Sequence, residues 1–311
     1  MHYNTIHSES QESVESSKFF HVLASLLPHI LPAFRIRFYK HLIGTSMSEK
    51  IRTLWNLAKE AKKETKVALQ SMVLFLCLLI AVHLGDTARA VNSTYGDREL
   101  PIYSVKTDEK KIAISFDAAW GAEDFPKIME VLDKHNVKTT FFMTGEWVEK
   151  YPDCVKTLVK KGHDLGNHSA THPDMTKLSK EKQKEQKLNV HNAVKELTGY
   201  EMELFRPPYG AYNNEVIRTC YEVGYFPIQW DVDSLDWKNL SASEIINKVC
   251  NHKALGNGSI ILCHNGAKHT AEALDELLTN LKQQGYELVP ISELIFRENF
   301  HMDVTGQQIA D

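Results

Sequence analysis

The stretch Ile112-Ala-Ile-Ser-Phe-Asp-Ala-Ala-Trp-Gly121 begins as an apolar, β-rich run, and the run ends at a carboxylate, Asp117. An amphipathic pattern typical of a helix follows near Asp124–His135. A short apolar run before a helical pattern predicts a strand that leads into a helix, which is the unit from which parallel α/β sheets are built. The same unit recurs along the rest of the chain.

Strand and helix patterns alternate through most of the chain, so the predicted fold class is α/β with parallel strands and right-handed crossovers. Strands are expected at Ile112–Phe116, Thr139–Met143, Asp164–Asn167, Leu204–Arg206, Phe226–Val232, Ser259–Cys263 and Glu287–Pro290. Helices are expected at Asp124–His135, Pro152–Lys161, Ser179–Leu197, Asn213–Val223, Ser241–His252 and Thr270–Gln284. Seven such units fit a barrel with one unit fewer than the usual eight, and a doubly wound open sheet is the alternative.

Ionisable side chains gather where the expected strands end. They are Asp117 after the first strand, His168 and His172 after the third, Arg206 after the fourth, Asp231, Asp233 and Asp236 after the fifth, and His264 after the sixth. The carboxyl ends of parallel strands share one face of such a fold, and that face carries the chemistry. We therefore expect these groups to meet there and to form an active site.

His168 and His172 have a spacing that metal ligands often show. Neutral imidazole suits zinc and similar divalent ions, and two histidines with one carboxylate leave a coordination position open for water. Pro173 follows directly, so His172 is expected on an extended loop and not inside a helix.

In this order, the motifs resemble those of the NodB-type polysaccharide deacetylases, also called carbohydrate esterase family 4. The likeness covers about residues 108–296. It implies a distorted (β/α)7 barrel that removes acetyl groups from N-acetylated sugars of chitin, peptidoglycan or a related polymer. The form Ser115-Phe-Asp-Ala-Ala-Trp-Gly121 is similar to that of a sporulation-associated subgroup.

The resemblance also implies a role for each matching residue. Asp117 would be the general base, kept ionised by Arg206, and His168 and His172 would be metal ligands. His264 would be the general acid, oriented by the carboxylate of Asp236. The Tyr209 backbone N–H would be an oxyanion donor, and Trp237 and Leu262 would line the acetyl pocket.

One position departs from the family pattern. Family members usually have two adjacent aspartates after the first strand, the second of them a metal ligand, and this chain has Ala118 there. A divalent metal, with zinc as the candidate, is therefore expected to bind more weakly, with too few protein ligands. Glu123 or Asp124 could supply a carboxylate, although each is more typical of a charge at a helix N-terminus.

The N-terminal third has the features of a targeting region. The run Val67–Leu84 contains no Lys, Arg, Asp or Glu and is just long enough to cross a bilayer. Lysines immediately before it predict that the N-terminus lies in the cytoplasm and the body outside. Ala88-Arg-Ala90 has the form of a signal-peptidase site. Two interpretations are therefore possible: a single-pass membrane anchor, or a secreted protein cleaved near Ala90.

The predicted organisation follows from these boundaries. It comprises residues 1–66 as a cytoplasmic or untranslated region, 67–84 as the anchor or signal core, 85–107 as a linker, 108–296 as the deacetylase domain and 297–311 as a C-terminal tail. Met47 is an alternative start.

Composition and charge exclude some classes of function. The 311 residues are 43% hydrophobic and 24% charged, which is ordinary for a globular chain. Residues 85–311 carry 26 basic and 34 acidic residues, which argues against a nucleic-acid partner. The five cysteines lack a C-x-x-C spacing, so neither a disulfide framework nor a cysteine zinc site is expected.

We therefore expect an extracytoplasmic hydrolase that removes N-acetyl groups from a cell-envelope polysaccharide. The alternative is a catalytically inactive glycan-binding or scaffold member of the same fold. The sequence gives no indication of the oligomeric state.

Overall fold

The computed structural model describes Arg52, Thr94, Tyr95 and residues 98–311. The predicted apolar segment 67–84, the region before it apart from Arg52, and most of the predicted linker lie outside the described residues. Among the residues that are described, no helix combines the length and the apolar character needed to cross a bilayer.

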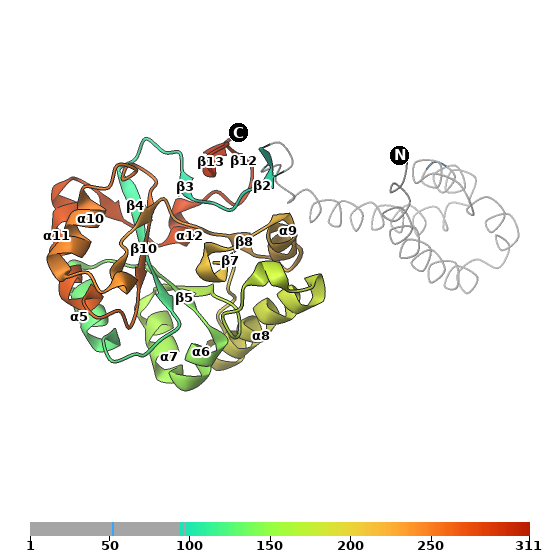
Figure 1. Cartoon of the computed structure of the whole chain (residues 1–311), viewed down its shortest axis with the longest axis horizontal. Helices are drawn as coiled ribbons and strands as arrows, with labels where there is room; N and C mark the ends of the chain where they lie inside the picture. The colour runs from blue at the N-terminus through green and yellow to red at the C-terminus, as the bar shows by residue number, and fades with distance from the viewer. Residues whose placement is uncertain (1–51, 53–93, 96–97) are drawn as a thin grey trace, which may run out of the picture. The chain divides into compact units, whose positions relative to one another are not determined.

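A parallel sheet forms the centre of the domain and curls into part of a barrel (Figure 1). Its members are β4 (Lys111–Ala118), β5 (Thr140–Met143), β6 (Asp164–Asn167), β7 (Leu204–Phe205), β8 (Phe226–Pro227), β9 (Val232–Asp233), β10 (Ile260–His264) and β11 (Glu287–Leu288). The order is β8-β7-β6-β5-β4-β10-β9, and β11 pairs with the start of β4. A curled parallel sheet of this order confirms the α/β prediction and is consistent with a distorted (β/α)7 barrel.

The segment Ile102–Val105 forms backbone hydrogen bonds beside β8 and at the start of β10, two strands that are not neighbours in this order. Its first residue donates its N–H to the carbonyl of Pro227 at 2.9 Å and accepts from the N–H of Gln229 at 2.7 Å, beside β8. Its last residue donates to the carbonyl of Gly258 at 2.9 Å, just before β10. The chain that enters the domain therefore links the strands that the sheet itself leaves apart.

The expected strand Phe226–Val232 is in fact two short strands, β8 and β9. Between them, the Asp231 carboxylate accepts hydrogen bonds from the Ile260 N–H and the Ser259 hydroxyl, both at 2.9 Å. Because Ile260 begins β10 and His264 ends it, Asp231 lies near the opposite end of that strand from His264. The prediction that Asp231 joins the other ionisable groups at the carboxyl ends is wrong.

Helices follow the strands, as the alternation predicts. They are α5 (Phe125–His135), α6 (Gly145–Lys150), α7 (Pro152–Lys161), α8 (Lys180–Thr198), α9 (Asn214–Glu222), α10 (Ala242–Cys250), α11 (Thr270–Gln283) and α12 (Ile291–Leu294). At the start of α10, Ser241 and Glu244 form a capping box, in which each side chain accepts from the backbone N–H of the other. No sequence pattern predicted α6 or α12.

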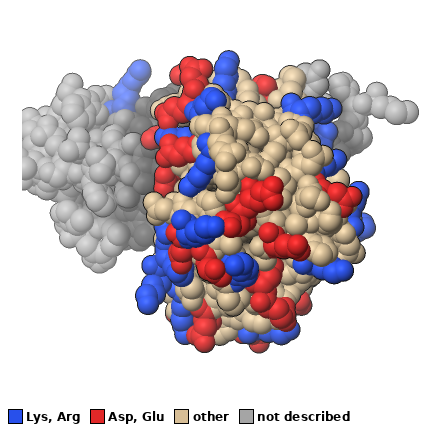
Figure 2. All heavy atoms as spheres, turned by 90° about the vertical axis from the view of Figure 1, so that its left-hand side faces the viewer, with Lys and Arg blue, Asp and Glu red and all other residues tan. Residues whose placement is uncertain are grey.

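The exposed faces of the helices carry mixed charges. Figure 2 shows Lys and Arg side chains interspersed with Asp and Glu on the face that carries α10 and α11. Lys134 of α5 and Asp275 of α11 form an ion pair at 2.7 Å, which links two neighbouring helices. Such exposed pairs contribute about 0–1 kcal/mol each, so the fold depends mainly on its core.

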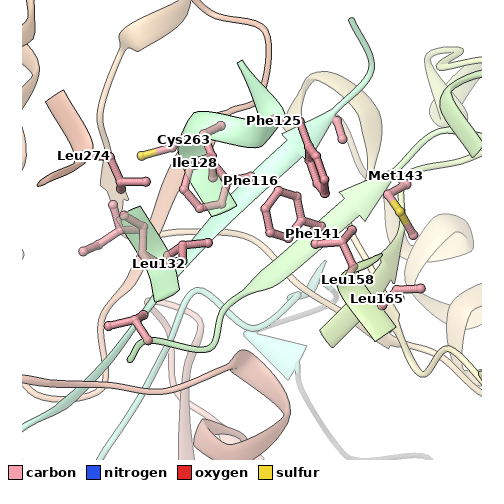
Figure 3. Packing of buried hydrophobic residues seen from close by; sticks show 14 of the residues in the cluster. Phe116, Phe125, Ile128, Leu132, Phe141, Met143, Leu158, Leu165, Cys263 and Leu274 are labelled. Atoms are coloured by element: carbon pink, nitrogen blue, oxygen red, sulfur yellow. The ribbon is translucent and has the colours of Figure 1, made fainter. Parts of the chain in front are cut away.

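Strand alternation divides the buried side chains between two apolar clusters. On β4, even-numbered residues such as Phe116 and Ala118 belong to the larger cluster beneath the helices, whereas Ala113 belongs to the cluster inside the barrel. The Phe116 and Phe141 rings stack 5.0 Å apart in the larger cluster (Figure 3). Burying each such ring contributes about 1.5–3 kcal/mol. The opposite face of each strand remains for functional side chains.

The expected C-terminal tail 297–311 contains two strands, β12 (Phe300–Met302) and β13 (Gln307–Ala310). They form an antiparallel pair, and β13 runs parallel to β3 (Ser104–Val105). A separate short pair, β1 (Thr94–Tyr95) with β2 (Arg98–Glu99), precedes them. The C-terminal residues therefore pack against the segment Ile102–Val105, which links β8 to the start of β10.

Candidate active site

The strand register brings the predicted site residues together. His264, at the end of β10, is the direct partner of Asp117 near the end of β4. Asn167 at the end of β6 accepts the backbone N–H of Arg206 at 2.9 Å, and His168 follows Asn167 directly. Asp117, His168, Arg206 and His264 therefore lie at the carboxyl ends of neighbouring strands, as the sequence predicts.

Asp117 and Arg206 form a buried ion pair. The Arg206 Nη1 donates to Asp117 Oδ1 at 2.7 Å, and the guanidinium lies 4.1 Å from the centre of the Phe142 ring. Burial alone raises the pKa of Asp117, but the positive charge of Arg206 and the nearby histidines outweigh it and hold the pKa below its usual value. Asp117 is therefore ionised at neutral pH, which a general base requires.

His168 and His172 face each other through their Nε2 atoms, which are 3.2 Å apart. The Nδ1 of His168 lies 2.7 Å from the carbonyl oxygen of Arg206. A carbonyl only accepts, so Nδ1 carries the proton and Nε2 keeps its lone pair. Burial lowers the pKa of His168 to about 4 and also lowers that of His172. Both rings are therefore neutral at pH 7, the form that binds a metal.

The pair meets part of the requirement for a divalent metal. Two neutral imidazole nitrogens at this separation fit two ligand positions, and the carbonyl that orients His168 is the outer support such ligands usually have. Ala118 is buried in the cluster beneath the helices and supplies no ligand. Asp124 is bonded to Asn265 and Gly266. Within the described part of the chain, no group of three His, Cys, Asp or Glu side chains suits a metal.

His264 and Asp236 form the second ionisable pair. Asp236 Oδ1 lies 2.7 Å from the His264 Nδ1, and Oδ2 accepts the His264 backbone N–H at 2.7 Å. Burial by itself lowers the pKa of His264, but the bond to Asp236 and the charges of Asp117 and Asp236 reverse this effect, so the pKa is raised. A histidine kept protonated in this way can donate a proton.

The residues expected to line the site lie around these pairs. Tyr209 has a left-handed backbone, with φ of +60°, is 72% exposed, and packs edge-on against the His172 ring at 4.5 Å. Trp237 is 48% exposed and follows Asp236 directly. Leu262 is buried on β10 and, two residues before His264, points to the same side of the strand.

Two features of the site were not predicted. Trp120 stacks on the His264 ring, with the ring centres 5.3 Å apart and the planes 18° apart. The Thr270 hydroxyl donates to Asp236 Oδ2 at 2.7 Å. Asp233, expected among the ionisable groups of this face, accepts the Leu235 N–H in a turn at 2.8 Å. The sequence carries no signal for the contact at Thr270, because that residue belongs to the first turn of a helix with no functional motif.

Comparison with known families identifies the class of protein. A family model described as polysaccharide deacetylase matches residues 104–228. Peptidoglycan-N-acetylmuramic acid deacetylase PdaA of Bacillus subtilis is 33% identical over 220 residues, which are 70% of this chain and 83% of that protein. The chain belongs to the polysaccharide deacetylase family, carbohydrate esterase family 4, as the sequence motifs indicated.

Two further relatives refine the comparison. Peptidoglycan-N-acetylglucosamine deacetylase PgdA of Listeria monocytogenes is 40% identical over 218 residues, which cover 69% of this chain but only 46% of PgdA. The crystal structure of BA3943, a CE4 family pseudoenzyme from Bacillus anthracis, is similar with a TM-score of 0.61 and 32% identity over 68% of this chain and 73% of that one. A BA3943 mutant with restored enzymatic activity has the same TM-score and 36% identity, over 63% of this chain and 71% of that one.

Proposed function

We propose that this chain hydrolyses N-acetyl groups of amino sugars in a cell-envelope polysaccharide such as peptidoglycan. One observation carries the proposal: the ionised carboxylate of Asp117 and the protonatable ring of His264 lie at partner positions on adjacent strands. PdaA and PgdA are named as deacetylases of peptidoglycan sugars, which supports this class of polymer.

In the proposed reaction, Asp117 accepts a proton from the attacking water, whose oxygen adds to the amide carbonyl. The carbonyl oxygen becomes negative and faces the Tyr209 backbone N–H, and a donor of this kind contributes about 3 kcal/mol. The carbon–nitrogen bond then breaks, and His264 donates its proton to the departing amine. Acetate and a free amino sugar are released, while Trp237 and Leu262 border the acetyl methyl group.

His168 and His172 are the residues that would hold a divalent ion, and zinc suits their imidazole nitrogens. Such an ion supplies Lewis-acid polarisation of the carbonyl and a lower pKa of water. Since Ala118 offers no oxygen, these two rings are the protein's contribution. Arg206 supports them, because its own carbonyl fixes the tautomer of His168.

Ala118 is also the observation that favours a second candidate function. A chain without the usual aspartate there would bind glycans as an inactive member of the fold. This candidate predicts that His264→Ala leaves sugar binding unchanged and that neither form releases acetate.

We further propose that the domain at residues 108–296 works outside the cytoplasmic membrane. The apolar run Val67–Leu84 and the lysines before it support an exported body, held by a single-pass anchor or released by cleavage near Ala90. Assignment to the sporulation-associated subgroup is part of this proposal and rests on the Ser115–Gly121 motif.

Acetate release tests the proposed activity. The purified full chain, with zinc added, is incubated with an N-acetylglucosamine oligomer and with peptidoglycan, and free acetate is measured. We expect release by the unaltered chain and its loss in Asp117→Asn, with Asp275→Asn on the surface as the control. Folded protein that releases no acetate from either polymer would contradict the proposal and leave the glycan-binding candidate.

A further inference from the structure

Two loops are tied together beside His264 by the carboxylate of Asp124. Oδ1 of Asp124 accepts from the Asn265 side-chain amide at 2.9 Å, and Oδ2 accepts from the Gly266 N–H at 2.8 Å. Asp124 stands at the N-cap position of α5 but makes no side-chain cap bond to that helix. Its carboxylate therefore serves the loop after β10 and not the helix that it precedes.

The same two loops touch at Gly266. This glycine has φ of +82°, and a Cβ built on it would lie 3.1 Å from the Trp120 Cβ and 3.2 Å from the Gly121 nitrogen. The Trp147 indole N–H donates to the Gly121 carbonyl at 3.2 Å and holds the first loop from its other side. The backbone that carries Trp120 is thus fixed between Trp147 and the loop that follows His264.

The consequence of this arrangement is the position of Trp120. Its indole lies nearly parallel to the His264 ring at 5.3 Å, and it is 48% exposed. Asp236 holds the Nδ1 edge of the same imidazole. An edge bond alone leaves the plane of the ring free to tilt, whereas a second contact on its face fixes that plane. A protonated imidazole also gains energy from an aromatic face.

We propose that Asp124 is a positioning residue, which ties the loop at 265–267 to the loop at 119–124 and so holds Trp120 against His264. The direction of the His264 Nε2 is then set by Asp236 at the edge of the ring and by Trp120 on its face. This inference rests on the proposed function, in which that nitrogen gives a proton to the departing amine. Misplacing a catalytic group by about 1 Å can cost about 10²-fold in rate, so a small tilt is enough to matter.

The test compares Asp124→Asn with Glu130→Gln in the full chain. Asparagine is as good an N-cap residue as aspartate, so the start of α5 is preserved. Its neutral amide has one acceptor oxygen in place of two charged ones, so the tie to the Asn265 amide and the Gly266 N–H is weakened. Glu130 lies exposed on α5, where it pairs with Lys127, and its change to glutamine removes the same charge. Asn265→Ala removes the amide that donates to Asp124. It is the second variant to test if Asp124→Asn fails to fold.

Two readouts are used. The first is kcat and KM for acetate release from an N-acetylglucosamine oligomer. In Asp124→Asn we expect kcat to fall about 10-fold with KM changed less than about 2-fold, and no change in Glu130→Gln. The second is the proton NMR signal of the His264 ring, which the indole displaces by its ring current. We expect Trp120→Leu to remove this displacement, and Asp124→Asn to reduce it.

The outcomes separate the two proposals. If the unaltered chain shows the ring-current displacement but releases no acetate, the proposed function is contradicted. The contact between Trp120 and His264 is then still supported. A His264 signal in folded Asp124→Asn that matches the unaltered chain overturns the tie. Equal kcat in Asp124→Asn and Glu130→Gln overturns the positioning role.

Discussion

Asp236 binds His264 with both carboxylate oxygens, one on the ring Nδ1 and one on the backbone N–H of the same residue, each at 2.7 Å. The side chain and the main chain of His264 are therefore fixed by a single buried carboxylate. Because Nδ1 is occupied, Nε2 is the nitrogen left for a substrate. The same pairing raises the pKa of His264 although burial opposes it.

The first prediction concerns Asp236→Asn and the pH profile. An acid that must be protonated loses activity as the pH rises through its pKa. Without the carboxylate the pKa of His264 falls, so the alkaline limb of kcat/KM should move to lower pH. The control is Asp275→Asn, since Asp275 pairs with His135 on the surface at 2.6 Å, away from the site. An alkaline limb that stays in place would show that another group supplies the proton.

Stability gives a second readout for the same variant. The pKa of His264 is raised on folding, so its pair with Asp236 stabilises the fold fully below about pH 6.5, the ordinary histidine value, and this contribution is lost as the pH rises through the folded-state pKa. The Tm difference between the unaltered chain and Asp236→Asn should therefore be largest at acidic pH and shrink above neutrality.

The second prediction concerns Arg206→Met. Removing the guanidinium leaves the burial of Asp117 unopposed, so the pKa of Asp117 rises and the acid limb of kcat/KM moves to higher pH. At pH 7 the loss should approach the ~10²–10⁴-fold contribution of a general base. The variant should also lose about 3–5 kcal/mol of unfolding free energy, since it leaves one buried charge unpaired.

Arg297→Met is the matched control for this change, because Arg297 forms an ion pair with Glu203 at the surface. Its loss should cost less than about 1 kcal/mol and leave the pH profile unchanged. A folded Arg206→Met chain with an unshifted acid limb would show that Asp117 does not depend on Arg206 for its charge.

Sequence patterns predicted the regular parts of the fold well. The strand Asp164–Asn167 and the helix Pro152–Lys161 have the predicted bounds, because periodicity and glycine or proline punctuation define them locally. The division of the expected strand Phe226–Val232 into two was not predicted, because it depends on the bonds of Asp231 to a strand almost 30 residues later in the chain. Non-local contacts of this kind leave no mark in a local pattern.

At the site, too, local patterns predicted some contacts and left others unpredicted. Asp117 and His264 could be placed together, because parallel strands end at the same edge and each residue ends an apolar run. The bond from Thr270 to Asp236 and the stacking of Trp120 on His264 could not be foreseen. Both depend on how a loop and the first turn of α11 fold back beside the site, and such geometry has no fixed spacing along the chain.

The third prediction concerns metal binding by the histidine pair. We expect equilibrium dialysis to show one zinc per chain, lost in His168→Ala, because the Nε2 atoms of His168 and His172 converge. His191→Ala is the control, since that imidazole is held by Tyr225 and Glu201 and not by the site. Equal zinc in the unaltered chain and in His168→Ala would place the ion elsewhere, and no zinc in the unaltered chain would exclude the pair as a metal site.

The last prediction concerns the segment Ile102–Val105, which links β8 to the start of β10. Gly258 has φ of +80°, and a Cβ there would lie 1.7 Å from the carbonyl oxygen of Val105, which is backbone and has little freedom to move. Gly258→Ala should therefore combine the cost of a left-handed alanine with that of a displaced strand, about 2–5 kcal/mol in all. Denaturant unfolding measures this loss.

Gly162→Ala separates the two contributions. Gly162 has a similar φ of +76°, but a Cβ there would meet nothing within 4 Å. It should lose only the conformational cost, about 1–2 kcal/mol. The excess loss in Gly258→Ala then measures the close approach of Val105, which joins the segment entering the barrel to the start of β10. If the two variants lose equal stability, the contact at Val105 does not help to hold this segment against the start of β10.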